Sequence, residues 1–402
     1  MDLKTYCCDG LESELIRGEL LMKRIGRCII VLLLILFSTT GCWNLKEPNQ
    51  LAFFTGNGLD LTEDGKLEAT VLIVTPAGIG GGQFSSGDKK KGYQVVSATG
   101  KNVSDAITNI QSKLSRHVFP GHRDIFLVGQ RLADQGIGET IDPFLRNAHS
   151  DLRSLIYLVK DAKPEEIFSI EPFFDQFITT SLSDEQTAIG IKPYLAREFV
   201  IDVLSEGTQP LMPVVSLNPQ NHYNFDGSAI FNKEDNVKLV GFLNKKETFY
   251  ANWVKDRLSS HTLTSFINQG DGTISITLGS FKRHITVKEV DEEIHIDLRL
   301  SGKGTIIENS TNLDPSKGVD LKLIEDELEK ITQKAIEKQI KMVQKKYKMD
   351  IYGFGESVHQ QYPKQWKTIK HNWSEHFSQL HVSVNVDLTC NNPGQANWSI
   401  YP

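Results

Sequence analysis

The sequence is poor in cysteine, in net charge and in long apolar runs, and each shortage excludes a class of protein. Five cysteines among 402 residues are too few for a scaffold built from disulfides. The 44 basic and 50 acidic side chains leave a net charge of −6, which provides no positive field for binding nucleic acid. With 39% hydrophobic and 23% charged residues, the composition indicates a soluble globular protein rather than a polytopic membrane protein or a disordered tail.

An apolar run near the amino terminus has the properties of a secretory signal. It extends without interruption from Cys28 to Phe37, whereas a helix needs about 20 apolar residues to cross a bilayer. The basic flank that such a signal requires is formed by Lys23, Arg24 and Arg27. Small residues follow the run and end at Gly41–Cys42, which resembles a bacterial lipobox. Thr39 departs from that motif, which usually has leucine three residues before the cysteine.

The lipobox resemblance implies cleavage before Cys42 and attachment of lipid to its thiol. The alternative is an ordinary signal peptide followed by a cysteine with no special role. Residues 1–21 do not fit either signal, because acidic side chains occupy positions where basic charge belongs: Asp9, Glu12, Glu14 and Glu19. We therefore expect Met22 to be the true start, residues 1–21 to be an overlong extension, and residues 1–41 to be removed.

Lipidation changes the meaning of the cysteine count. Cys7, Cys8 and Cys28 precede the cleavage point, so the mature chain keeps Cys42 and Cys390. With Cys42 lipidated, no intramolecular disulfide is possible, and apolar cores must hold the protein together. Diacylglycerol supplies two acyl chains, and stable anchoring takes two hydrophobic signals. The sequence predicts a chain tethered to the membrane without spanning it.

The first part of the mature chain, residues 42–210, reads as an α/β domain. Alternating apolar residues predict strands at 67–73 and 93–99, and shorter buried strands are expected at 124–129 and 152–159. Asn102 has the position of a helix N-cap before an apolar face that starts at Val103. Strands alternating with helices favour this fold class.

The second part predicts two further units and an overall α+β protein of three mixed α/β domains. Residues 210–223 contain three prolines and no charged residue, which suggests a linker. A small middle domain at 211–268 is expected to contain a hairpin over 226–243 and a helix. Residues 269–402 alternate strands with a long amphipathic helix at 320–348 and a second helix at 364–378.

Motifs for catalysis, cofactors or metals are weak throughout. Gly82 and Gly87 have the spacing of a phosphate loop, but Asp88 stands where the lysine belongs, so residues 77–92 read as a flexible loop. Surface or capping roles are expected for the three histidines His371, His376 and His381. No set of residues suggests a reaction, so the sequence predicts a tethered binding or assembly protein without cofactor and without enzymatic activity.

Several short motifs, taken in order, resemble the Ger(x)C family, the lipoprotein C subunits of nutrient germinant receptors in endospore-forming bacteria. The resemblance covers nearly the whole mature chain. It is carried by these segments and residues: Gly41-Cys42-Trp43-Asn44, Glu47, Gly56-Asn57-Gly58-Leu59-Asp60, Gly121-His122, Leu132-Ala133-Asp134-Gln135-Gly136-Ile137, Arg146, Arg153, Met349-Asp350-Ile351-Tyr352-Gly353-Phe354-Gly355-Glu356, Pro363, Trp366 and Trp373.

The resemblance implies a protein on the outer face of the spore inner membrane, beside integral-membrane A and B subunits. It also implies three mixed α/β domains and no recognised catalytic residues, so only Cys42 receives a defined role, as the lipid anchor. We expect Gly353, Gly355, Trp366 and Trp373 to determine the fold rather than to bind a ligand. A lipid-anchored solute-binding protein is the alternative, and it would show two similar α/β lobes around a cleft.

Overall fold

The structure is a computed structural model, and it describes residues 22, 24–27, 29–31, 50–74, 92–119, 123–146, 152–291 and 293–392. The chain divides into two compact units, Met1–Leu51 and Ala52–Pro402, and each is described by itself. In the first unit, residues 24–27 and 29–31 are helical. Across the described ranges, no helix combines the length and the apolar character needed to span a membrane.

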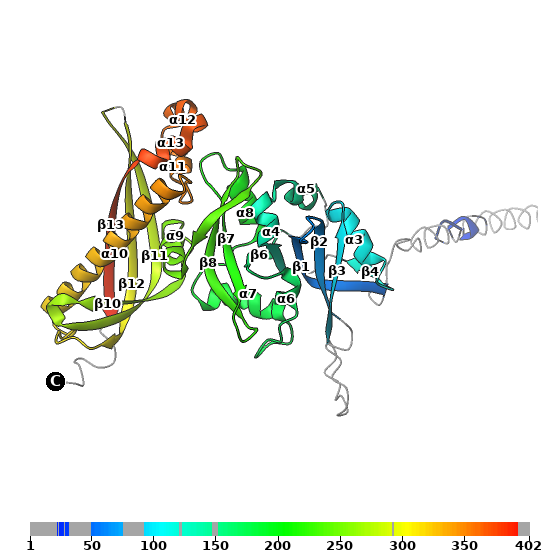
Figure 1. Cartoon of the computed structure of the whole chain (residues 1–402), viewed down its shortest axis with the longest axis horizontal. Helices are drawn as coiled ribbons and strands as arrows, with labels where there is room; N and C mark the ends of the chain where they lie inside the picture. Colours follow the sequence, from blue (N-terminus) through cyan, green and yellow to red (C-terminus); the bar gives the residue numbers. More distant parts are fainter. Residues whose placement is uncertain are drawn as a thin grey trace, which may run out of the picture. The chain divides into compact units, whose positions relative to one another are not determined.

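A large mixed sheet organises the first half of the second unit (Figure 1). Among the described residues it has nine strands, in the order β3-β2-β1-β5-β6-β7-β8-β9, with β4 paired to β1. Pairing is parallel from β1 through β5 and β6 to β7, and antiparallel toward both edges. The strands are β1 Leu51–Leu61, β2 Leu67–Val74, β3 Tyr93–Gly100, β4 His117–Phe119, β5 Ile125–Gly129, β6 Leu155–Lys160, β7 Leu211–Leu217, β8 Tyr223–Asn232 and β9 Lys238–Leu243.

Helices cover both faces of this sheet. One core contains residues of α3 (Val103–Gln111), α4 (Gln130–Gln135), α5 (Gly138–Arg146) and α8 (Ala196–Leu204). The opposite core contains residues of α6 (Pro164–Phe168) and α7 (Ile178–Ala188). Strand β5 is buried on both sides, since Phe126 belongs to the first core and Leu127 to the second.

The predicted N-cap of the first of these helices is confirmed. The Asn102 side chain accepts a hydrogen bond from the Asp105 backbone N–H at 2.9 Å. The Asp105 carboxylate in turn accepts the Lys101 N–H at 2.8 Å. These side chains satisfy backbone donors around the start of the helix, where helical partners are lacking.

The linker expected at 210–223 was wrong, because Leu211–Leu217 is strand β7 inside the large sheet. Its first five residues are buried, which explains both the lack of charge and the lack of alternation. Pro213 is accommodated where the pairing with β8 shifts register, between Pro213 and Val215. The hairpin expected at 226–243 is present as β8 and β9, but it continues the same sheet. The division into three domains stays a prediction.

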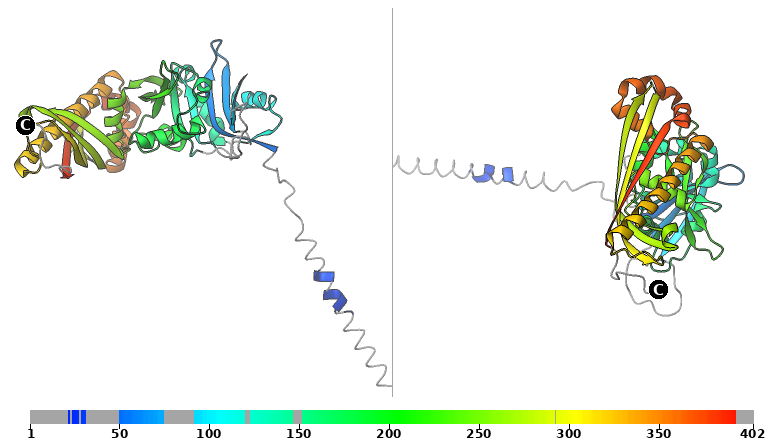
Figure 2. Two further views of the ribbon diagram at one scale, coloured as in Figure 1. Left: turned by 90° about the horizontal axis from the view of Figure 1, so that it is seen from below. Right: turned by 90° about the vertical axis from the view of Figure 1, so that its left-hand side faces the viewer.

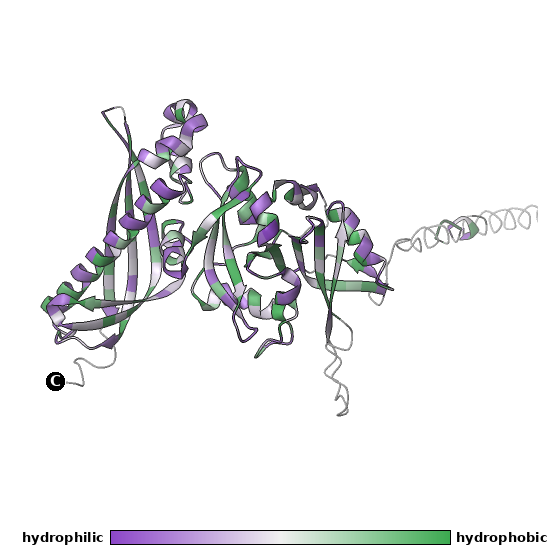
Figure 3. Cartoon of the chain, viewed as in Figure 1, coloured by the Kyte–Doolittle hydropathy of each residue, from purple (hydrophilic) through white to green (hydrophobic). Residues whose placement is uncertain are grey.

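The second half is built on a four-stranded sheet, ordered β10-β11-β12-β13 within the described part of the chain. Its strands are β10 Ser260–Ile267, β11 Gly272–Val290, β12 Glu293–Asn309 and β13 His381–Asn392. Helix α10, Gly318–Lys346, lies lengthwise along this sheet (Figures 1 and 2). Hydrophobic and hydrophilic residues alternate along α10 in Figure 3, as expected for a helix with one buried face. Helix α9, Lys245–Val254, packs against β8 and β11.

The second helix expected at 364–378 is broken. It forms α12 (Pro363–Ile369), the short η3 (Lys370–Asn372) and α13 (Trp373–Gln379), preceded by α11 (Phe354–Gln361). Seven residues span about 10.5 Å along a continuous helix, whereas the rings of Trp366 and Trp373 meet edge to face at 5.2 Å. The break brings the two indoles together. The α+β class with several domains is confirmed.

Candidate functional site

The buried carboxylate of Asp350, which follows α10, accepts five hydrogen bonds. Its Oδ1 accepts backbone N–H groups of Tyr352 and Gly353, each at 3.0 Å, and of Phe354 at 3.3 Å. Its Oδ2 accepts the Gly355 N–H at 2.7 Å and the Trp373 Nε1–H at 3.0 Å. Burial raises the pKa of Asp350, and these donors oppose the rise. Asp350 therefore fixes the turn that begins α11 and orients an indole.

The glycines of this turn are required by space and by backbone conformation. Gly353 has φ +78°, which side-chain-bearing residues rarely adopt. A Cβ on Gly355 would lie 2.6 Å from Nε1 of Trp373 and 2.8 Å from the carbonyl oxygen of Gly207. A Cβ on Gly207 would lie 2.2 Å from the backbone N of Glu356. The two backbone segments therefore touch.

This contact joins the two sheets of the second unit. The Gln209 N–H donates to the Asp350 carbonyl at 2.8 Å, and Ser205 Oγ donates to the Glu356 carboxylate at 3.2 Å. The indole of Trp366 donates its Nε1–H to Glu206 at 3.0 Å, and Lys370 Nζ donates to the same carboxylate at 2.9 Å. The sequence assigned fold-determining roles to the glycines and tryptophans but did not identify the opposing segment 205–209.

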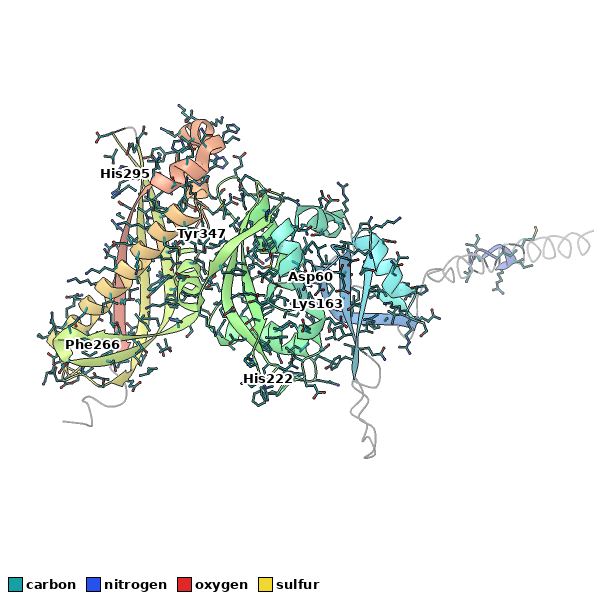
Figure 4. All side chains as sticks on the ribbon, viewed as in Figure 1. Asp60, Lys163, His222, Phe266, His295 and Tyr347 are labelled. Atoms are coloured by element: carbon teal, nitrogen blue, oxygen red, sulfur yellow. The ribbon has the colours of Figure 1, made fainter. Side chains whose placement is uncertain are left out.

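A cavity of about 620 Å³ lies at a second contact between the two halves. Its walls come from the segment before α7, from α7 itself, from the start of β8, and from α9 and β10. Its lining includes Phe173, Phe174, Asp175, Asp184, Glu185, His222, Tyr223, Phe225, Lys245, Phe249 and His261. His222, labelled in Figure 4, directly precedes β8. The cavity is walled mainly by aromatic rings and carboxylates.

Burial shifts the ionisation of three of these groups. It raises the pKa of the Glu185 carboxyl to about 7, against the opposing charge of Lys245. It raises the pKa of Tyr223 to about 12, and the carboxylates of Glu185, Asp175 and Asp184 add to that shift. It lowers the pKa of His261 to about 4, and that ring stacks on Phe249 with 3.4 Å between centroids.

Another cavity, of about 650 Å³, lies between β1, β2, α3 and α5. Asn57, Arg123 and Arg146 are among its polar lining residues, and Arg146 is held by Asp142 at 2.6 Å.

Asp60, labelled in Figure 4, is a buried residue that the sequence reading did not interpret. Its Oδ1 accepts the Leu132 N–H at 3.2 Å, and burial raises the pKa of its carboxyl. A Cβ on Gly129 would lie 2.0 Å from the Asp60 carboxyl carbon, so glycine is required there. Asp60 thus satisfies a donor at the start of α4.

The other residues that the sequence singled out do not belong to these cavities or contacts. Cys42, the predicted lipid anchor, lies outside the described residues, as does most of the predicted flexible loop at 77–92. His371, His376 and His381 are exposed. Within the described ranges, no group of three or more histidine, cysteine, aspartate or glutamate side chains is arranged to hold a metal ion.

The cavity beside α7 was missed because its residues come from four separate segments. A local signal did exist in the pair Phe173-Phe174, which are 76% and 100% exposed. Adjacent exposed aromatic rings are unusual on a surface without a binding role.

Comparisons with known proteins identify the family. Residues 44–217 match the "Spore germination protein N-terminal domain", and residues 226–394 match "Spore germination B3/ GerAC like, C-terminal". The chain belongs to the Ger(x)C family. Members of this family are germinant receptor C subunits, and the expected resemblance is confirmed.

Relatives in Bacillus subtilis (strain 168) match over almost their whole length. Spore germination protein YndF is 24% identical over 395 residues, covering 92% of this chain and 96% of the relative. Spore germination protein KC is 22% identical over 399 residues, covering 93% and 97%. The crystal structure of the GerBC protein superposes with a TM-score of 0.54 at 19% identity, covering 84% of this chain and 97% of GerBC. That structural likeness supports the fold.

Proposed function

We propose that this Ger(x)C protein is a membrane-anchored lipoprotein subunit, needed for the germination response to nutrients through assembly with integral-membrane A and B subunits. In this proposal diacylglycerol on Cys42 holds the chain on the outer face of the spore inner membrane. The protein acts by binding and assembly, without catalysis and without a cofactor.

One observation carries the proposal. The family's N-terminal domain match begins at residue 44, two positions after Cys42, and the two matches together run to residue 394. The predicted lipid site therefore stands directly before the family domains. A basic flank and an apolar run precede it, as a lipoprotein signal requires.

The alternative of a solute-binding protein has less support. That class would show two similar lobes, whereas this chain has a mixed sheet flanked by helices on both faces and a smaller four-stranded sheet with a long helix. The two halves do not repeat one another.

Cys42→Ala tests the anchor. We expect the variant to leave the membrane fraction, to lose incorporation of labelled fatty acid, and to impair nutrient-triggered germination. Cys390→Ala is the matched control, because Cys390 is a buried residue of β13 far along the chain, and it should retain label and membrane association. Full membrane retention of Cys42→Ala would contradict the anchoring proposal.

Cross-linking in dormant spores tests the partners. A photoreactive residue at exposed Val319 or Ile307 is expected to yield adducts with an A or B subunit if its surface faces them. A panel of such photoreactive residues at exposed positions of both sheets would sample the other surfaces that could face an A or B subunit. Absence of A and B adducts at every site would contradict assembly.

A further inference from the structure

The cavity beside α7 has the composition of a ligand site rather than of a packing defect. Its volume of about 620 Å³ lies within the usual range for small-molecule pockets, about 300–1,000 Å³. Packing defects inside protein cores are much smaller. Aromatic rings from separate elements form its walls. The ring centroids of His222 and Phe173 are 4.4 Å apart, and those of His261 and Phe249 are 3.4 Å apart.

The charge around the cavity is strongly one-sided. Four carboxylates line it, those of Glu171, Asp175, Asp184 and Glu185, against one ammonium group, that of Lys245. Lys245 Nζ already donates to the Asn224 side chain at 3.1 Å. Because opposite charges attract and like charges repel, this wall favours a cation and disfavours an anion.

Glu185 is the group that distinguishes a cation site from a merely acidic surface. Its side chain is half-buried, and its Oε2 is a buried acceptor with no hydrogen-bond partner among the described residues. A buried polar atom left without a partner costs about 1–3 kcal/mol. An ammonium group on a ligand in the cavity would give this carboxylate the opposite charge and a charge-assisted donor.

We propose that this cavity binds a small organic ammonium compound, whose charged nitrogen pairs with the Glu185 carboxylate and whose apolar body lies against the aromatic wall. Aromatic faces attract cations as well as apolar groups, so both parts of the ligand have a partner. Phe173 and Phe174 line the cavity and are exposed, so they offer uncovered apolar surface to that body. The inference stands apart from the membrane anchor and from the A and B subunits.

The test uses three probes that share one apolar body and differ in charge: 2-phenylethylammonium, 2-phenylethanol and 3-phenylpropanoate. Binding to the full chain, held in phosphatidylcholine nanodiscs, is measured by calorimetry at about pH 8.5, where the Glu185 carboxyl is ionised, with empty nanodiscs as the reference. We expect the ammonium probe to bind about tenfold more tightly than the alcohol, since one charge-assisted hydrogen bond is worth about 1.5–3 kcal/mol. The carboxylate probe should bind most weakly.

Matched variants locate the site. Glu185→Gln keeps the shape of the side chain and removes its charge, so it should abolish the preference for the ammonium probe. Glu308→Gln makes the same change at an exposed position of β12 and should leave the preference intact. Phe173→Ala, at a largely exposed position, should weaken the binding of all three probes by a similar factor.

Four results would overturn the proposal. They are equal affinity for all three probes, tightest binding of the carboxylate, a preference for ammonium that survives in Glu185→Gln, and no ammonium binding at millimolar concentration. A cooperative thermal melt of each variant confirms that it is folded.

Discussion

The indole Nε1 of Trp373 donates a hydrogen bond to Oδ2 of Asp350 at 3.0 Å, inside a core from which water is excluded. The same carboxylate accepts four backbone N–H groups of the turn that follows it. One side chain therefore determines where α10 is succeeded by α11 and where α13 packs. Because Gln209 donates to the Asp350 carbonyl, the same residue also joins the two sheets.

Asp350→Asn should destabilise the protein by about 3 kcal/mol. The amide offers one acceptor oxygen in place of two, and its NH₂ would face donors that already lack other partners. Urea denaturation of the full chain measures the loss. Asp387→Asn makes the same change at an exposed position of β13 and should alter stability by less than about 0.5 kcal/mol. Equal stability of the two variants would show that the Asp350 carboxylate is dispensable.

Gly355→Ala should also destabilise the protein, by about 1–3 kcal/mol, because the added methyl group overlaps Trp373 and the Gly207 carbonyl. Gly318→Ala is the matched control, since nothing lies within 4 Å of its added Cβ at the start of α10. Alanine there should be neutral or slightly stabilising, because it favours helix over glycine. Thermal melts of the two variants give the comparison, and similar midpoints would contradict the close approach.

The sequence predicted helices and strands best where one face of the element is buried and the other is exposed. Strict alternation predicted β12, and spacing on one helical face predicted α10 to within two residues at each end. Asn102 was recognised because an N-cap acts through neighbours three residues away. Such signals are local, so a single sequence contains them.

The missed features depend on residues that are distant in the chain. Strand β7 is buried on both faces and therefore lacks the alternation that marks a strand. The break between α12 and α13 follows from contacts of Trp366 with Glu206 and of Trp373 with Asp350. The cavity around Glu185 is assembled from α7, β8, α9 and β10. No local sequence pattern encodes these contacts between residues that are distant in the chain.

Removing two glutamates of α10 should expose the outer edge of β13. Glu329 accepts the Leu388 N–H at 2.9 Å, and Glu325 accepts the Cys390 N–H at 2.8 Å, so the helix satisfies donors that an edge strand would otherwise present. In Glu325→Ala/Glu329→Ala, amide exchange at both positions should accelerate about tenfold or more, and self-association should increase.

Asp326→Ala provides the control for that pair. Asp326 lies on the same helix and is bound to Lys322 at 2.7 Å on the exposed face. Its removal should leave exchange at Leu388 and Cys390 unchanged. If the control accelerates exchange as much as the double variant, general loosening of α10 is responsible rather than the two capping bonds.

Two titratable groups in the cavity, Glu185 and His261, should make the free energy of unfolding depend on pH in opposite directions. The Glu185 carboxyl has a pKa of about 7 in the folded chain against 4.5 for its ordinary value, so the folded state holds the extra proton between those limits. Its contribution to the free energy of unfolding is present below about pH 4.5 and is lost as pH rises to 7, by at most about 3 kcal/mol. His261 has a folded pKa of about 4 against 6.5, so its contribution is lost as pH falls from 6.5 to 4.

Because the two effects oppose each other between about pH 4.5 and 6.5, single variants should separate them. Glu185→Gln should be more stable than the parent chain at pH 7, and its advantage should shrink toward pH 4.5, where the parent carboxyl is already protonated. His261→Gln should gain relative to the parent as pH falls, since it no longer has to keep a buried imidazole neutral. Urea denaturation at half-unit pH steps measures both differences, with Glu308→Gln as the reference. A difference between Glu185→Gln and the parent that does not vary with pH would show that this carboxyl titrates as it does in water.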